Sequence, residues 1–184
     1  MRPLPFETVR LSDDGRLCIL DQRMLPGREE YIELQTAEDV WHAIKDLAVR
    51  GAPLIGVAAA YGFYISVKDI DDDFLAGCRK VRDYLDSSRP TAVNLSWALD
   101  RMMRVAEAGG PDVKVRLLAE ARAIHREDIS MTELMGRHGY GLIGPSTGIL
   151  THCNAGALAT SGYGTALAPV YAALDAGRTD LRVY

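Results

Sequence analysis

The spacing of apolar residues predicts an α/β protein, with an α+β N-terminal part followed by the start of a Rossmann-like parallel sheet. Three short alternating segments come first and predict a small antiparallel sheet. Five segments with helical periodicity follow, and then an apolar run leads through a glycine-containing loop into another helix. A strand, a loop and a helix in that order open a β-α-β unit. We therefore expect two domains, residues 1–140 and 141–184, with the second truncated at its first β-α-β unit.

The N-terminal strands are predicted over residues 6–11, 16–21 and 31–34. The first two are separated by Ser12-Asp13-Asp14-Gly15, and Pro26-Gly27 lies before the third. Both sequences are rich in turn-forming residues. Because short turns join antiparallel neighbours, we expect one small antiparallel sheet.

Helical periodicity begins at Thr36, whose hydroxyl is suited to capping, and extends to Arg50. Pro53 is suited to the first turn of the next helix, which continues through Tyr61. This segment is apolar all round, so we expect it to be buried on every side. Further helices are predicted over residues 72–85, 91–108 and 111–138.

The C-terminal part begins after Gly139-Tyr140-Gly141, which is expected to close the last of these helices. Ile149-Leu150 is a short apolar run that predicts a buried strand. Residues 151–160 are small and polar, a helical pattern follows over 165–176, and residues 181–184 begin a second strand. Open α/β sheets place their ligands at the carboxyl ends of strands, so the loop after Leu150 is the first candidate site.

The composition indicates a soluble globular protein and excludes several classes of function. Among 184 residues, 21 are basic and 25 acidic, which gives a net charge of −4. Proteins that bind nucleic acids or membrane surfaces concentrate Lys and Arg, so we expect neither partner. The most apolar stretch is too short to span a membrane, and no signal peptide is evident, so we expect a cytoplasmic protein.

The three cysteines, Cys18, Cys78 and Cys153, are far apart and form no metal-binding pair, which favours a reducing compartment. Cys78 lies in an apolar helical stripe and is expected to pack in the core. Cys153 stands at the mouth of the candidate loop, a setting suited to a reactive thiol beside an anion. The alternative is a buried small hydrophobe at a strand end. His152 precedes it, but strand alternation would point the two side chains to opposite faces.

Two arginines stand at predicted helix entries, Arg50 before Gly51-Ala52-Pro53 and Arg89 before Pro90. A guanidinium beside the free N–H groups of a helix start is suited to holding a phosphate. For each arginine, the alternative is a solvent-exposed residue between two helices. Together with the Cys153 thiol, the pair indicates an anionic small molecule held by its phosphate. No sequence pattern for a nucleotide loop, a metal site or a serine nucleophile is present.

Three motifs resemble the methylthioribose-1-phosphate isomerase family of methionine salvage: residues 50–62 (Arg50 to Gly62), 89–95 (Arg89 to Leu95) and 151–160 (Thr151 to Thr160). They stand in the family's order, and the resemblance covers nearly the whole chain but only the N-terminal half of a family member. It implies an aldose–ketose isomerase that converts 5-methylthioribose 1-phosphate to 5-methylthioribulose 1-phosphate. It also implies a homodimer that needs no metal or nucleotide cofactor.

The resemblance implies roles for individual residues as well. Arg50, Gly51 and Ala52 would bind the substrate, chiefly its phosphate, and Arg89 would also bind it. Cys153 would be the active-site thiol in an apolar pocket that excludes water. The family's catalytic Asp lies downstream of these 184 residues, so the chain alone is expected to be inactive. The alternatives are a sister isomerase, for ribose 1,5-bisphosphate or 5-deoxyribose 1-phosphate, a non-catalytic subunit like those of the translation initiation exchange factor, and a structural or dimerisation fragment.

Overall fold

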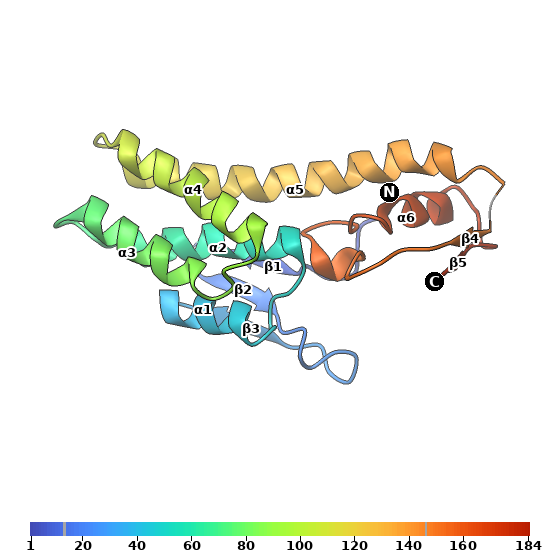
Figure 1. The fold of residues 1–184 in the computed structure, drawn as a ribbon, viewed down its shortest axis with the longest axis horizontal. Helices are drawn as coiled ribbons and strands as arrows, with labels where there is room; N and C mark the ends of the chain where they lie inside the picture. Colours follow the sequence, from blue (N-terminus) through green and yellow to red (C-terminus); the bar gives the residue numbers. More distant parts are fainter. Residues whose placement is uncertain (13, 146) are drawn as a thin grey trace.

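The computed structural model describes residues 1–12, 14–145 and 147–184, and it confirms the α/β class (Figure 1). The N-terminal strands are β1 (Val9–Leu11), β2 (Leu17–Leu20) and β3 (Tyr31–Leu34). They form an antiparallel sheet in the order β1-β2-β3, as predicted, with Ile19 opposite both Val9 and Ile32. β2 is buried throughout because it is the central strand. The predicted turn between β1 and β2 includes Asp13, which lies outside the described residues.

Helix α1 (Ala37–Lys45) begins as predicted but ends earlier than expected. Thr36 Oγ1 accepts a hydrogen bond from the Asp39 backbone N–H, and the Asp39 carboxylate accepts one from the Thr36 N–H, which completes a capping box. The prediction that this helix reaches Arg50 is wrong, because Leu47 adopts a left-handed conformation with φ of 64°. The apolar pattern in the sequence continues beyond the end of the helix because Ala48 is also buried in the core.

Helix α2 (Ala52–Val67) passes through the middle of the molecule (Figure 1), and its residues 54–63 are buried on every side, as predicted. A Cβ on Gly62 would lie 2.6 Å from Val40 Cγ1, so α1 and α2 are in very close contact. Besides α1, its neighbours are β1, β2, α3 (Phe74–Asp86), α4 (Val93–Ala108), α5 (Val113–Ile143) and the 3₁₀ helix η1 (Ala157–Ala159). Cys78 on α3 is fully buried in this core, which confirms its packing role, and burial raises the pKa of its thiol to about 11.

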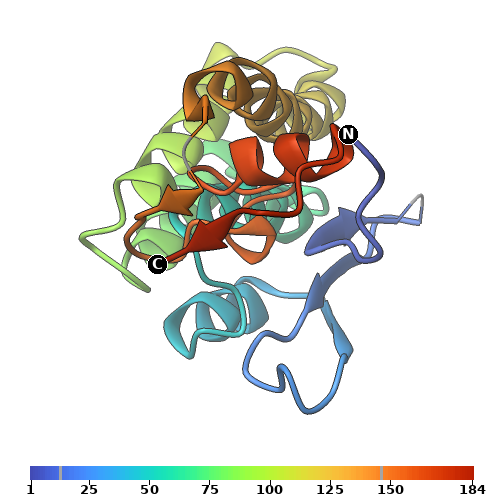
Figure 2. The same ribbon diagram turned by 90° about the vertical axis from the view of Figure 1, so that its right-hand side faces the viewer.

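Helix α5 continues to Ile143, so the prediction that it closes at Gly139-Tyr140-Gly141 is wrong. Helix α6 (Ala168–Asp175) lies beside the last turns of α5 (Figure 2). A Cβ on Gly139 would lie 2.4 Å from Cγ of Pro169 on α6. This glycine therefore permits close helix packing, and the helix instead ends at Gly144, where φ is 56°.

The C-terminal segment contains β4 (Gly148–Ile149), the short 3₁₀ helix η1 (Ala157–Ala159) and β5 (Arg182–Val183). β4 and β5 pair in parallel, which confirms the predicted β-α-β order. Leu150 is exposed, so the expectation that both residues of the Ile149-Leu150 run are buried is wrong. The division into domains 1–140 and 141–184 stays a prediction. Within the described ranges, no helix is both long and apolar enough to cross a membrane.

A buried polar pair links α2 to α5. The Tyr61 hydroxyl lies 2.8 Å from Nδ1 of His125, and the two rings meet edge to face. Burial lowers the pKa of His125 to about 4 and raises the pKa of Tyr61 to about 12. The imidazole is therefore neutral in the folded state at neutral pH, and its Nδ1 shares one hydrogen bond with the Tyr61 hydroxyl.

Replacing Gly139 by alanine should destabilise the protein, whereas Gly141→Ala should stabilise it. Both glycines lie within α5, but a Cβ at Gly141 meets nothing within 4 Å. We expect the Gly141 change to raise the free energy of unfolding by about 0.5–1 kcal/mol through helix propensity. We expect the Gly139 change to lower it by about 1–3 kcal/mol through overpacking against Pro169. Thermal denaturation of both variants checks this, and equal effects would contradict the packing role of Gly139.

Protonation of His125 should destabilise the protein in mild acid. The unfolded state takes up a proton near pH 6.5, whereas the folded state resists it down to about pH 4. The contribution of His125 to stability is thus complete above pH 6.5 and decreases as the pH falls toward 4, by up to about 3 kcal/mol. Denaturant titrations between pH 7 and 4 should show a shallower pH dependence for His125→Gln. The exposed His138→Gln is the control and should leave the wild-type slope unchanged.

Candidate functional site

The first and third motifs meet at the N-terminus of α2. Gly51 is the N-cap of this helix and has φ of 108°, in the region that favours glycine. A Cβ on Gly51 would lie 2.4 Å from Cα of Ala159 in η1. The segment Arg50-Gly51-Ala52 therefore lies directly against the end of the loop that carries Cys153.

A buried glutamine joins the two motifs. Gln22 follows β2 and is only 1% exposed. Its Nε2 donates to the Leu158 carbonyl at 2.7 Å, and its Oε1 accepts from Arg50 Nε at 3.3 Å. Gln22 lies outside the three sequence motifs, although the polar Asp21-Gln22 pair stands at the carboxyl end of a wholly buried strand.

Cys153 is exposed, so its alternative assignment as a buried hydrophobe is wrong. It lies in a bend with φ of 69°, beyond the end of β4. Strand alternation therefore does not govern His152 and Cys153, and both side chains are exposed. The water-excluding pocket implied by the resemblance does not enclose the thiol in this chain.

The loop that carries Cys153, residues 151–160 and here called the thiol loop, is closed at its base by hydrogen bonds from backbone N–H groups. The Ala155 carbonyl accepts from the Thr165 N–H at 2.9 Å and from the Leu167 N–H at 3.3 Å. Thr160 Oγ1 accepts from the N–H groups of Gly162 and Gly164, at 3.1 and 3.0 Å. These bonds fix the chain on the C-terminal side of Cys153.

Helix α5 holds the same segment through two buried side chains. Asp128 Oδ2 accepts from the Ser161 N–H at 2.6 Å, and Thr132 Oγ1 accepts from the Tyr163 N–H at 3.2 Å. Burial raises the pKa of Asp128, although the Ser161 hydrogen bonds oppose that effect. Sequence periodicity did not single out Asp128, because its partner lies in a distant loop.

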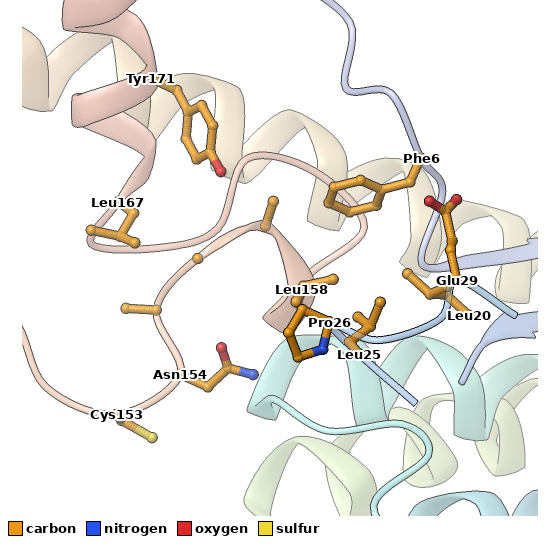
Figure 3. Close-up of a pocket in the computed structure, with 13 residues that line it drawn as sticks. Phe6, Leu20, Leu25, Pro26, Glu29, Cys153, Asn154, Leu158, Leu167 and Tyr171 are labelled. Atoms are coloured by element: carbon orange, nitrogen blue, oxygen red, sulfur yellow. The ribbon is translucent and has the colours of Figure 1, made fainter. Parts of the chain in front are cut away.

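A cavity of about 510 Å³ opens beside the thiol loop (Figure 3). Cys153 and Asn154 lie at one side of it, and Leu158 lies among the apolar side chains near its middle (Figure 3). Glu29 is the one carboxylate among the described lining residues. The remaining walls are apolar or aromatic and come from Phe6, Leu20, Leu25, Pro26, Ala155, Gly156, Ala157, Leu167 and Tyr171.

A second cavity, of about 390 Å³, lies between α2, α4 and α5. Pro53 from the first motif and Asn94 from the second both line it. Arg89 itself is half-buried in the loop between α3 and α4. In the part of the chain that the structure describes, Arg89 makes no hydrogen bond or ion pair with the other predicted site residues. The structure thus brings Arg50, Gly51 and Ala52 to the thiol loop, whereas no hydrogen bond or ion pair among the described residues joins Arg89 to them.

Residues 48–184 match the initiation factor 2 subunit family. A methylthioribose-1-phosphate isomerase of Symbiobacterium thermophilum is 48% identical, over 95% of this chain and 51% of that protein. A 5-deoxyribose 1-phosphate isomerase of Bacillus cereus is 49% identical, over 96% of this chain and 52% of that protein. The chain spans about half the length of these curated relatives, as the resemblance of the three motifs predicts.

Two solved structures have the same fold. The 5-methylthioribose 1-phosphate isomerase of Pyrococcus horikoshii gives a TM-score of 0.84 at 35% identity, over 98% of this chain and 52% of that chain. The translation initiation factor eIF-2B subunit delta from A. fulgidus gives 0.83 at 37% identity, over 97% of this chain and 53% of that chain. The fold alone therefore does not separate an isomerase from a translation factor subunit.

Replacing Gly51 by alanine should destabilise the protein because the change adds a steric clash to backbone strain. We expect the free energy of unfolding to fall by about 3 kcal/mol or more, since the Ala159 backbone cannot yield as a flexible side chain can. Gly177 is the matched control, because it has φ of 89° and a Cβ added there would meet nothing within 4 Å. Gly177→Ala should cost about 1 kcal/mol from backbone strain alone. Chemical denaturation measures both, and equal losses would show that the contact with η1 is unimportant.

Proposed function

The chain belongs to the initiation factor 2 subunit family, and we propose that within this family it carries part of the substrate site of a sugar-phosphate isomerase. The proposed reaction converts 5-methylthioribose 1-phosphate to 5-methylthioribulose 1-phosphate in methionine salvage. The observation that carries the proposal is the contact between the Arg50-Gly51-Ala52 segment and the thiol loop. The isomerase names of relatives near 50% identity support it.

Arg50, Gly51 and Ala52 are proposed to bind the phosphate. The N-terminus of α2 has no side-chain cap, and its partial positive charge favours an anion. Arg50 is exposed, and Gln22 is its one hydrogen-bond partner among the described residues. Its terminal amino groups are thus available for a bidentate contact with phosphate oxygens. Arg89 is proposed to join them as a further substrate-binding residue.

Cys153 is proposed to contact the reacting carbons. The phosphate on O1 prevents the sugar from opening to a free aldehyde, so the C1–O4 bond must break with protonation of O4. Hydrogen then moves from C2 to C1, and the C2 hydroxyl releases its proton to a base as it becomes a carbonyl, which balances the proton taken up by O4. A positioned acid is required for the ring opening. By the resemblance, this acid is an Asp outside residues 1–184, so the chain alone is proposed to be inactive.

The cavity beside Cys153 is proposed to receive the substituent on C5. Its apolar walls suit a methylthio group, and its volume of about 510 Å³ is ample for one. The methyl group of 5-deoxyribose 1-phosphate would also fit, and a relative carries that name. A second phosphate, as in ribose 1,5-bisphosphate, would be poorly placed among these side chains. We further propose a cytoplasmic homodimer without a resident metal or nucleotide, and without nucleic-acid or membrane partners.

A non-catalytic subunit is the second candidate, because the eIF-2B subunit delta of A. fulgidus shares the fold at 37% identity. Such a subunit needs neither an accessible thiol nor an arginine without a carboxylate partner. The presence of both Cys153 and Arg50 in one region therefore favours the isomerase.

The test is an isomerase assay on the complete protein that contains this chain, with each of the three candidate sugar phosphates as substrate. We expect turnover of 5-methylthioribose 1-phosphate, and a loss in kcat of about 100-fold or more for Cys153→Ala. Cys18→Ala is the control, because Cys18 is a buried thiol on β2. The 184-residue chain should show no turnover. Failure to convert any substrate would favour the non-catalytic subunit, and full activity of Cys153→Ala would exclude the thiol.

A further inference from the structure

Gln22 occupies a buried junction between three segments of the chain. Its backbone N–H donates to the Ala48 carbonyl at 3.1 Å, two residues before Arg50. Its side chain joins Arg50 to Leu158, with one hydrogen bond at each end of the carboxamide. With an exposed fraction of 1%, the side chain itself is shielded from any ligand.

We propose that Gln22 is a positioning residue that fixes the Arg50 guanidinium relative to the thiol loop. This inference rests on the proposed function, because it assigns Arg50 to the substrate phosphate. A free arginine side chain samples many rotamers, and ordering it costs entropy at the moment of binding. The Gln22 side-chain carbonyl accepts a hydrogen bond from Arg50 Nε before the ligand arrives. Part of the entropy loss from ordering Arg50 therefore occurs during folding and not during binding.

The chemistry of an amide suits this task better than that of a carboxylate. A carboxylate beside Arg50 would form an ion pair and compete with the phosphate for the guanidinium. An amide carbonyl accepts the Nε hydrogen bond but leaves the positive charge uncompensated. Within the described residues, Arg50 has no acidic partner, unlike Arg23, which pairs with Asp21 at 2.6 Å.

The other end of Gln22 fixes the thiol loop. The Leu158 carbonyl lies in η1, a single turn whose carbonyls have few partners within the helix. The Nε2 group satisfies this oxygen at 2.7 Å. Leu158 also contributes to the wall of the cavity beside Cys153 (Figure 3). A single side chain thus sets the spacing between the phosphate-binding arginine and the cavity wall.

Two substitutions of Gln22 change its two side-chain hydrogen bonds in different ways. Gln22→Glu keeps an acceptor for Arg50 but adds a competing charge and loses the donor to Leu158. Gln22→Met has a similar length and removes both hydrogen bonds. The chain offers a matched control in Gln35, its other glutamine, which is exposed, so Gln35→Glu adds the same charge at the surface.

The experiment measures two quantities on the complete protein. The first is the Kd for inorganic phosphate by calorimetry, and the second is the KM and kcat for 5-methylthioribose 1-phosphate. For Gln22→Glu we expect the Kd and the KM to rise about ten-fold, because the new carboxylate competes for Arg50. For Gln22→Met we expect a rise in Kd of about five-fold, because Arg50 is no longer ordered. Gln35→Glu should match the wild type, and thermal denaturation verifies that each variant is folded.

A double-substitution cycle with Arg50 decides whether the effect passes through that residue. In the Arg50→Gln background, Gln22→Glu should cause no further rise in the Kd for phosphate. An equal rise in both backgrounds, or unchanged phosphate binding in Gln22→Glu, would overturn the inference. So would a wild-type protein that does not bind phosphate. If the wild type binds phosphate but converts no sugar, the proposed function fails while the phosphate data still decide the role of Gln22.

Discussion

The burial of α2 over residues 54–63 is the constraint on which the rest of the structure depends. A helix with no polar face is stable only when other elements cover every side, and here strands and helices from both ends of the chain do so. Close approach is possible because glycines face the neighbours: a Cβ on Gly56 would lie 2.9 Å from the Asn94 carbonyl oxygen. The N-terminus of α2 is held in place by this packing, and the candidate site is built around it.

The site combines a fixed framework with accessible chemical groups. Gly51 lies against η1, and the segment after Cys153 is hydrogen-bonded to itself and to α5 through Asp128. Arg50 and Cys153 are nevertheless exposed. Rigid support beneath reactive side chains limits the reorganisation needed when a ligand binds. Under the proposed function, a sugar phosphate held by Arg50 would therefore meet a thiol whose loop is already fixed on its C-terminal side.

Buried polar groups explain why these segments hold together. The Gln22 carboxamide, the Asp128 carboxylate and the Thr132 hydroxyl are each buried and each hydrogen-bonded to a residue far away in the sequence. An unpaired polar group in such a position would cost about 1–3 kcal/mol. These hydrogen bonds therefore connect the thiol loop to β2 and α5. Moving the loop away from either element would leave buried polar groups without partners.

The sequence alone determined the three strands, the cap at Thr36, the all-buried α2 and the motifs around Arg50 and Cys153, because each has a local pattern of polarity or spacing. Only the tertiary structure decided that Leu47 ends α1, that Gly139 continues α5 against Pro169, that Cys153 is exposed and that Gln22 pairs with Arg50. The physical reason is common to the last three. A glycine, a free thiol or a glutamine fits several local environments, and the partners that choose between them lie far along the chain.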